Sequence, residues 1–253
     1  MQTRIQSLIE QHLEEGHLLN PILFKGEMVR ANNKGNKTET RRIVRPQPIM
    51  CYGGKNVVSV SKLGRHDGYA ILEDAAGNIT GSPYGGEGDL LWVRENFRIG
   101  AWNWKKQSVA VDYQADGYCR EEWLHVPDRE MFERFATQSL TEAEKNFDGA
   151  SDGGYTWKPG ESPCRWRPSI HMPLCLTRTL LRVLEVRVER IQDIDYEGMM
   201  SEGLEVRTIL GAELRGRWIH LWDSINGERR IDGKRVNWKA NPWVWVVRYE
   251  VIT

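Results

Sequence analysis

The chain is organised around the stretch Gly35-Asn36-Lys37-Thr38-Glu39-Thr40-Arg41-Arg42. A short apolar segment, Ile22 to Phe24, precedes it and predicts a buried strand. Residues 27 to 33 have the composition of one or two helical turns, which end where Gly35 turns the chain. We expect the chain to run extended from there to Pro46, because the residue before a proline is pushed out of the helical region.

The charged and hydroxyl side chains of this stretch alternate along the predicted strand. Successive side chains of a strand point to opposite faces. One predicted face carries Lys37, Glu39 and Arg41, and the other carries Thr38, Thr40 and Arg42. Such a set can bind an anion, transfer a proton, or do both. The alternative is that the charges only cover an exposed strand edge, where lysine discourages aggregation.

Length and charge limit the classes of function. A chain of 253 residues can form one large domain or two small ones with a real core. Lysine plus arginine total 35 and aspartate plus glutamate total 35, so the formal net charge is zero. A protein that coats duplex DNA without sequence preference is usually more basic. Any contact with nucleic acid is therefore expected in one local basic cleft.

No segment predicts a membrane span, a signal peptide, a metal or a cofactor. No apolar run approaches the length of a membrane span, and the first residues lack the apolar core of a signal peptide. We therefore expect a cytoplasmic protein without a membrane partner. The four cysteines are widely spaced, and Cys119, Cys164, His171 and Cys175 follow no structural zinc spacing. The sequence also lacks phosphate-loop, dinucleotide, zinc-protease and nucleophile-elbow motifs.

An amphipathic helix is predicted for residues 1 to 20, ahead of the main domain. Its apolar face carries Ile5, Leu8, Ile9 and Leu13, and the helix is expected to end near Gly16. It either packs on the body of the protein or contacts another subunit. The sequence leaves both possibilities open, and the oligomeric state with them.

Three segments lie between the opening stretch and the C-terminal third. Residues 90 to 97 predict a strand that ends in Arg94 and Glu95, a position from which functional side chains project; a surface ion pair is the alternative. Residues 116 to 165 are polar and predict an insertion with little core of its own, either a lid or a partner-binding loop. Residues 166 to 173 place Arg167, Ser169 and His171 on alternate positions between two prolines, unless the prolines only make a rigid turn.

The C-terminal third supplies the candidate partner of Lys37. A helix is predicted from an N-cap at Asp193 through Met200, with Gly203 as its C-cap. Glu202 at the helix end lies against the helix dipole unless a cation meets it, and Lys37 is a possible partner; otherwise Glu202 is an exposed glutamate. The apolar residues 243 to 251 predict a strand through the core. Many strands and few, short helices favour an α+β domain on a small, curved or barrel-like sheet.

Several motifs together resemble a known family. They are Gly35-x-Lys37-Thr38-x-Thr40-Arg41, Gly88-Asp89-Leu90-Leu91-Trp92-Val93-Arg94-Glu95, Trp166-Arg167-Pro168-Ser169-Ile170-His171-Met172-Pro173, Ser201-Glu202-Gly203, Leu221-Trp222-Asp223-Ser224-Ile225-Asn226 and Asn241-Pro242-Trp243-Val244-Trp245-Val246. The chain resembles an ASCH domain of the PUA-like superfamily, in the long version common in phages and prophages. The resemblance spans most of residues 21 to 252 and leaves out the N-terminal helix and the insertion. It implies a PUA-like small β-barrel with a few helices at its mouth, and the host cytoplasm as location if the chain is phage-encoded.

The resemblance also implies a site. Some small ASCH proteins are amidohydrolases that act on N(4)-acetylcytidine, and Lys37, Thr40 and Glu202 stand at the positions of their catalytic set. Lys37 would deprotonate or orient Thr40, whose hydroxyl, or a water that it positions, attacks the amide carbonyl. Glu202 would orient Lys37 and tune its pKa. Arg41 and Arg94 would bind phosphate or hold an oxyanion.

Three functional hypotheses follow. The first is binding of RNA, DNA or a modified nucleoside in a basic cleft, and we place it first because the superfamily consists mostly of binders and a fold alone does not give a function. The second is an amidohydrolase on N(4)-acylated cytidine-type nucleosides that uses Lys37, Thr40 and Glu202. The third is a ribonuclease. The candidate binding residues are Thr38, Arg41, Arg42, Arg94, Glu95, Arg167, Ser169 and His171.

Overall fold

The structure is a computed structural model with mixed α and β content. It describes residues 2–48, 59–62, 70–74, 76–117, 122–146, 157–204 and 211–253. None of the helices in these ranges is both long and apolar enough to cross a membrane. The expected α+β class is therefore confirmed at this level.

The helices and strands have the following bounds. The α-helices are α1 (Gln2–Glu14), α2 (Gly26–Asn33), α3 (Arg129–Asn146), α4 (Tyr196–Ser201) and α5 (Gly211–Asn226). The strands are β1 (Leu19–Leu23), β2 (Glu39–Ile43), β3 (Ser59–Lys62), β4 (Ala70–Glu73), β5 (Ile79–Gly81), β6 (Leu90–Arg94), β7 (Phe97–Asn103), β8 (Ser108–Tyr113), β9 (Leu124–His125), β10 (Leu180–Arg190), β11 (Arg230–Ile231), β12 (Lys234–Arg235) and β13 (Trp243–Val251). Short 3-10 helices span Ser169–His171, Leu174–Leu176, Ile191–Asp193 and Trp238–Ala240.

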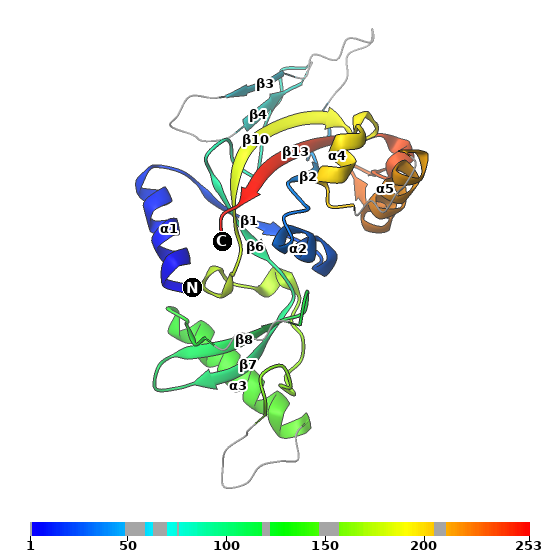
Figure 1. Ribbon diagram of the computed structural model, residues 1–253. Helices are drawn as coiled ribbons and strands as arrows, with labels where there is room; N and C mark the ends of the chain where they lie inside the picture. The colour runs from blue at the N-terminus through cyan, green and yellow to red at the C-terminus, as the bar shows by residue number, and fades with distance from the viewer. Residues whose placement is uncertain are drawn as a thin grey trace. The chain divides into compact units, whose positions relative to one another are not determined.

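The largest sheet has five strands in the order β1-β6-β10-β13-β2. Figure 1 shows its long antiparallel pair, β10 and β13, with β2 beside β13. In this order β1 and β2 are the edge strands and are not bonded to each other, so within the described residues the sheet is open rather than a closed barrel. The stretch that opens the sequence analysis therefore forms an edge strand.

The chain divides into two compact units. Unit 1 comprises Met1–Arg4, Ile22–Arg30 and Trp92–Thr179, and unit 2 comprises Ile5–Pro21, Ala31–Leu91 and Leu180–Thr253. Each unit has its own apolar clusters. Lys37, Thr40 and Glu202 belong to unit 2, whereas Arg94, Glu95, Arg167, Ser169 and His171 belong to unit 1.

Strand β13 carries apolar side chains on both of its faces in unit 2. Val244 and Val246 pack with Trp218 and Trp222 of α5 on one face. On the other face, Trp243 and Trp245 form a smaller cluster with Val44, which is joined by the partly buried Tyr84, Val186 and Val188. The first five residues of β13 are all buried, so the predicted core strand is confirmed. A strand covered on both faces gives a continuous apolar run in the sequence.

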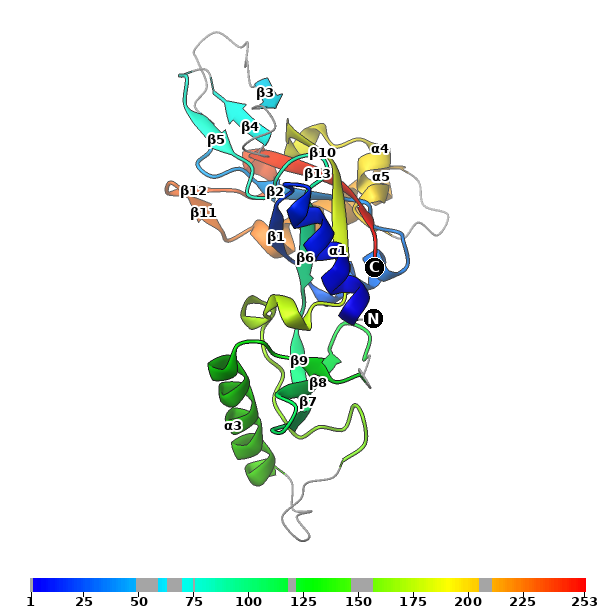
Figure 2. The same ribbon diagram turned by 90° about the vertical axis from the view of Figure 1, so that its left-hand side faces the viewer.

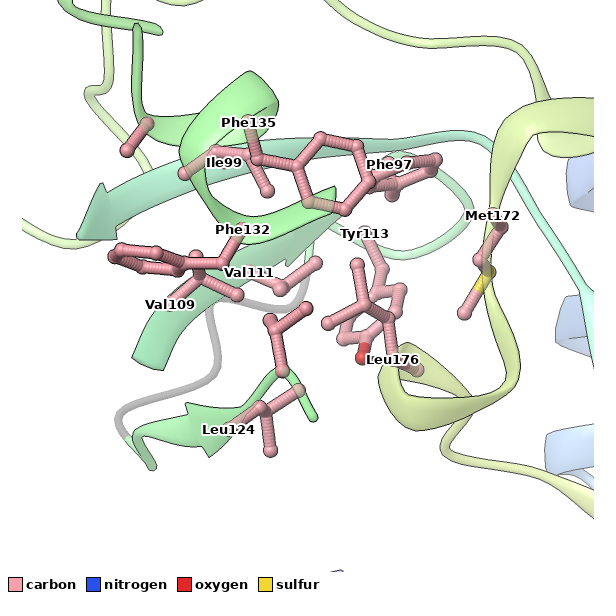
Figure 3. Close-up of a cluster of buried hydrophobic side chains, with 12 residues drawn as sticks. Phe97, Ile99, Val109, Val111, Tyr113, Leu124, Phe132, Phe135, Met172 and Leu176 are labelled. Atoms are coloured by element: carbon pink, nitrogen blue, oxygen red, sulfur yellow. Dashed lines mark hydrogen bonds between the residues drawn. The ribbon is translucent and has the colours of Figure 1, made fainter. Parts of the chain in front are cut away.

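Unit 1 has a core that the sequence analysis did not expect. Helix α3 lies along the sheet of β7, β8 and β9 (Figures 1 and 2). Its Phe132 and Phe135 pack against Phe97 and Val111 of that sheet (Figure 3). Residues 116 to 165 therefore do contribute to a core, contrary to our expectation. The aromatic side chains of α3 lie on one side of a helix whose other sides are polar, which gave the whole segment a polar composition.

The other helices follow the sequence with small shifts at their ends. Helix α1 starts at the N-terminus as expected and stops two residues before Gly16. Helix α4 begins later than predicted: Asp195 is its N-cap, and the Asp195 carboxylate accepts a hydrogen bond from the Gly198 N–H at 2.7 Å. Asp193 instead ends the preceding 3-10 helix. The predicted helix end at Glu202 and Gly203 is confirmed.

The core of unit 1 generates a test. Phe132→Ala removes a side chain that is only 2% exposed, and we expect it to lower the free energy of unfolding by about 3–5 kcal/mol through the cavity that it leaves. Urea unfolding followed by circular dichroism measures the change. Ile170→Ala, at a side chain that is 59% exposed, is the control and should have little effect. Equal effects of the two substitutions would contradict a packed core around α3.

Candidate functional site

Lys37 and Glu202 meet in a buried ion pair. The Lys37 Nζ lies 2.5 Å from Oε2 of Glu202, and the Lys37 side chain has no exposed surface. The backbones of the two residues also form an isolated antiparallel bridge, although 165 positions separate them. The cation that was expected to meet Glu202 at its helix end is therefore present.

The ammonium group of Lys37 has an acceptor for each of its three protons. Besides the Glu202 carboxylate, it donates to the backbone carbonyl of Glu39 at 2.8 Å and to that of Glu202 at 3.0 Å. A lysine ammonium has three donors and no acceptor. In this arrangement Lys37 is satisfied as a cation and presents no lone pair.

The pair also satisfies the free edge of β2. Glu202 Oε1 accepts the backbone N–H of Arg41 at 2.6 Å, while Lys37 binds the backbone carbonyl of Glu39. These two groups lie on an edge strand, where backbone donors and acceptors lack a neighbouring strand. Buried backbone groups need partners. The ion pair thus replaces the missing strand, and we call it the β2 edge clasp.

A larger network of charges surrounds the clasp. The Arg41 guanidinium, which is 1% exposed, pairs with Glu39 at 2.8 Å and with Glu189 at 2.7 Å. Arg187 binds the other oxygen of Glu39 at 2.9 Å. With the clasp, the network contains three cations and three carboxylates, so it is neutral. In the register, Arg187 stands opposite Val246 and Arg41 stands opposite Val246 from the other side, which explains why their side chains share a face.

Burial perturbs the lysine. Removal from water lowers the pKa of Lys37, and the negative charge of Glu202 opposes that shift. A buried ion pair contributes little net stability because desolvation offsets the attraction, but loss of one partner leaves an unpaired buried charge. Buried groups with a shifted pKa are also enriched at functional sites.

Thr40 lies on the opposite face of β2 from Arg41. It stands opposite Val247 in the register, and it is 2% exposed. The Thr40 hydroxyl makes no hydrogen bond within the described ranges and is not among the fully buried polar atoms that lack a partner, so it keeps contact with solvent. Thr38 is exposed, and Arg42, on the Thr40 face, is half-buried.

Two further residues complete the surroundings of the clasp. Tyr249 of β13 donates its hydroxyl to Asn32 Oδ1 at 2.9 Å, and both residues are buried. Burial raises the pKa of Tyr249 well above its ordinary value, and the charge of Glu202 adds to the shift. Gly203 has φ of +89°, and a Cβ there would lie 2.9 Å from Cβ of Ala31 and 3.1 Å from Cβ of Lys37. Glycine is therefore required where α4 passes the clasp.

The predicted residues Arg94 and Glu95 form contacts inside unit 1. Arg94 donates to the backbone carbonyls of Ser169 and Ile170. Glu95 is buried and binds Arg178 through two bonds of 2.7 and 2.9 Å. Burial raises the pKa of Glu95, and Arg178 opposes the shift. These contacts link strand ends to loops of the same unit, and neither residue forms part of the β2 edge clasp.

The other predicted unit 1 residues differ in exposure. Arg167 is 6% exposed and binds the Gln138 side chain at 2.7 Å, so its guanidinium faces the protein interior. The Ser169 backbone N–H donates to Asn96 at 2.9 Å, and His171 is exposed. Ser169 to His171 form a 3-10 turn rather than an extended segment. The predicted alternate presentation is therefore wrong for Ser169 and His171.

The sequence analysis missed Arg187, Glu189 and Tyr249. Arg187 and Glu189 are two positions apart in a strand, so their shared face was a detectable signal. Their contact with β2 depended on the strand order, which nothing in the sequence specified.

Cysteines and metals add nothing to this site. Cys164 and Cys175 are free thiols, whereas Cys51 and Cys119 lie outside the described residues. No group of three or more potential metal ligands occurs in the part of the chain that the structure describes. Comparisons with protein-family models, with curated proteins and with solved structures found no match for this chain.

The clasp predicts a large effect of removing its cation. Lys37→Met leaves the Glu202 carboxylate buried without its closest partner, and we expect a loss of about 3–5 kcal/mol in the free energy of unfolding. Adding Glu202→Gln should recover part of that loss, since the unpaired charge is gone. Lys34→Met, at an exposed lysine of the same loop, is the control. Urea unfolding of the four variants with the wild type gives the coupling, and additive effects would contradict the clasp.

Tyr249 predicts a dependence on alkaline pH. Near pH 8, Tyr249→Phe should be about 1 kcal/mol less stable than the wild type, because it loses the bond to Asn32. The raised pKa of Tyr249 keeps its proton on in the folded state, so the stability that it contributes is full below pH ~10 and falls above it. The variant lacks this loss. Its deficit should therefore shrink above pH ~10 in urea unfolding, and a constant deficit would count against burial of the phenol.

Proposed function

We propose that the chain is an ASCH-type protein of the PUA-like superfamily that binds a modified nucleoside or a nucleotide of RNA or DNA through the Thr40 face of β2. The proposal includes a PUA-like organisation of the sheet around this strand. The open five-stranded sheet, with the ends of α2 and α4 beside the start of β2, is compatible with that organisation.

The Thr40 hydroxyl is the observation that carries the proposal. It lies on a strand whose free edge is fixed by the clasp, and it has solvent contact but no protein partner in the described ranges. Arg42 follows on the same face. A hydroxyl next to a guanidinium on a rigid strand can read the polar edge of a base or sugar with little loss of conformational entropy.

Binding is better supported than catalysis because of the state of Lys37. A general base must have a free lone pair within reach of the proton that it takes. Lys37 is fully buried, and all three of its ammonium protons have acceptors. As it stands, Lys37 holds β2 in place and does not meet a substrate.

An amidohydrolase on N(4)-acylated cytidine-type nucleosides is the second candidate. The lowered pKa of Lys37 and its contact with Glu202 favour it, since burial beside a carboxylate is one way in which proteins prepare a lysine for proton transfer. In this reading Thr40, or a water that it positions, attacks the amide carbonyl after Lys37 loses a proton. The ribonuclease hypothesis stays a prediction.

The proposal is tested by calorimetric titration of the protein with cytidine, N(4)-acetylcytidine and other modified nucleosides. We expect at least one ligand to bind, and Thr40→Val to weaken its binding about fivefold through the loss of one hydrogen bond. Thr38→Val is the matched control, because Thr38 is exposed two residues away and should bind as the wild type does. Unchanged binding in Thr40→Val, or no binding of any nucleoside, would refute the proposal.

The same samples separate binding from hydrolysis. Chromatography after incubation with N(4)-acetylcytidine reports free cytidine. An intact ligand supports binding alone. Release of cytidine that disappears in Thr40→Val and persists in Thr38→Val would establish the second candidate instead.

A further inference from the structure

Three arginines of unit 2 gather around Tyr84. Arg42 and Arg45 lie in and just after β2, and Arg229 follows α5. Tyr84 packs on the cluster of Val44, Trp243 and Trp245, which places its ring beside the end of β2. Val44 directly precedes Arg45, and Arg42 stands opposite Trp245 in the register. Segments that are far apart in the sequence thus bring three guanidinium groups to one aromatic side chain.

This group of arginines has an excess of positive charge. All the charges that act on the pKa of Tyr84 are arginines, namely Arg42, Arg45 and Arg229. Burial lowers the pKa of Arg229, and the charge of Arg45 lowers it further. In the described part of the chain, neither Arg45 nor Arg229 forms an ion pair; Glu228, next to Arg229, is 3.3 Å from Arg235 instead.

The geometry of the group is held by neutral contacts. Arg229 donates from its guanidinium to Asn226 Oδ1 at 3.0 Å, which fixes one side of the fork. Gln47 donates to the backbone carbonyl of Val44 at 2.7 Å and accepts the Trp243 N–H at 2.8 Å, which fixes the chain after β2. The Tyr84 hydroxyl makes no hydrogen bond within the described residues and retains solvent contact. An ordered group of cations with a free hydroxyl lacks only an anion.

We infer that Arg42, Arg45, Arg229 and the Tyr84 hydroxyl form a phosphate-binding site for a nucleic-acid strand. This inference deepens the proposed function and rests on it for the nature of the strand. Arginine forks match phosphate oxygens in pairs of hydrogen bonds, and a phenol adds a further donor. Because Arg42 and Thr40 share a face of β2, a base read at Thr40 and its phosphate at this group would belong to one nucleotide or to neighbouring ones.

The site differs from the network around the clasp in its charge. The clasp network combines three cations with three carboxylates and attracts no anion. The arginine group lies at the other face of β2 and at its C-terminal end. A chain with zero formal net charge can therefore still contact nucleic acid through one local surface.

Fluorescence anisotropy of the full chain with a labelled single-stranded RNA and the matching DNA tests the inference. Arg45→Gln and Arg229→Gln should each weaken binding about tenfold, since each removes charge-assisted bonds to phosphate. The magnitude of the slope of log affinity against log salt should fall by about 0.7 for each arginine removed. Arg129→Gln and Arg182→Gln, at exposed arginines that pair with carboxylates, are the matched controls and should bind as the wild type does.

Competition identifies the source of the phosphate. Cytidine 5′-monophosphate and inorganic phosphate should displace the strand only weakly, and cytidine should displace it less than the monophosphate does. Equal loss in the control variants, or wild-type binding by Arg45→Gln and Arg229→Gln, would overturn the inference. Tight binding of the monophosphate without binding of either strand would also overturn it, in favour of a free nucleotide.

The two proposals fail separately. Strand binding that depends on Arg45 and Arg229 but not on Thr40 would support the phosphate site and refute nucleoside recognition at Thr40. Nucleoside binding that depends on Thr40, with no effect of either arginine on strand binding, would do the reverse.

Discussion

The open edge of β2 is the constraint on which the site depends. An edge strand needs partners for its buried backbone groups, and here a lysine and a glutamate from distant segments provide them. Because Lys37 and Glu202 must be buried to reach the edge, each needs the charge of the other. One interaction therefore fixes the start of β2, the end of α4 and the tight passage at Gly203.

The two faces of β2 have different characters as a result. Arg41, on one face, is consumed by carboxylates of β2 and β10, so it cannot also bind a ligand. Thr40, on the other face, keeps an uncommitted hydroxyl, and the chain beyond it leads to arginines without carboxylate partners. Electrostatics thus separates a structural side from a recognition side within five residues. Unit 1 contributes its predicted residues mainly to its own internal contacts.

The sequence could predict what local rules decide. The alternation that grouped Lys37, Glu39 and Arg41 is confirmed by their shared network, and the dipole argument at Glu202 led to its partner. Register and strand order depend on long-range pairing, so Arg187, Glu189 and Arg229 were out of reach. The core around α3 was missed because Phe132 and Phe135 are sparse in a polar segment, and only the facing sheet shows that they are buried.

The backbone N–H of Arg41 offers the most direct test of this account. It lies on a free sheet edge but donates to Glu202 at 2.6 Å. Native-state hydrogen exchange measured by nuclear magnetic resonance would report its protection. The clasp predicts exchange as slow as that of amides in the interior of the sheet, such as Val246, because it opens only when the buried ion pair breaks. Exchange as fast as that of an unpaired edge amide would contradict the clasp, and with it the basis for recognition at Thr40.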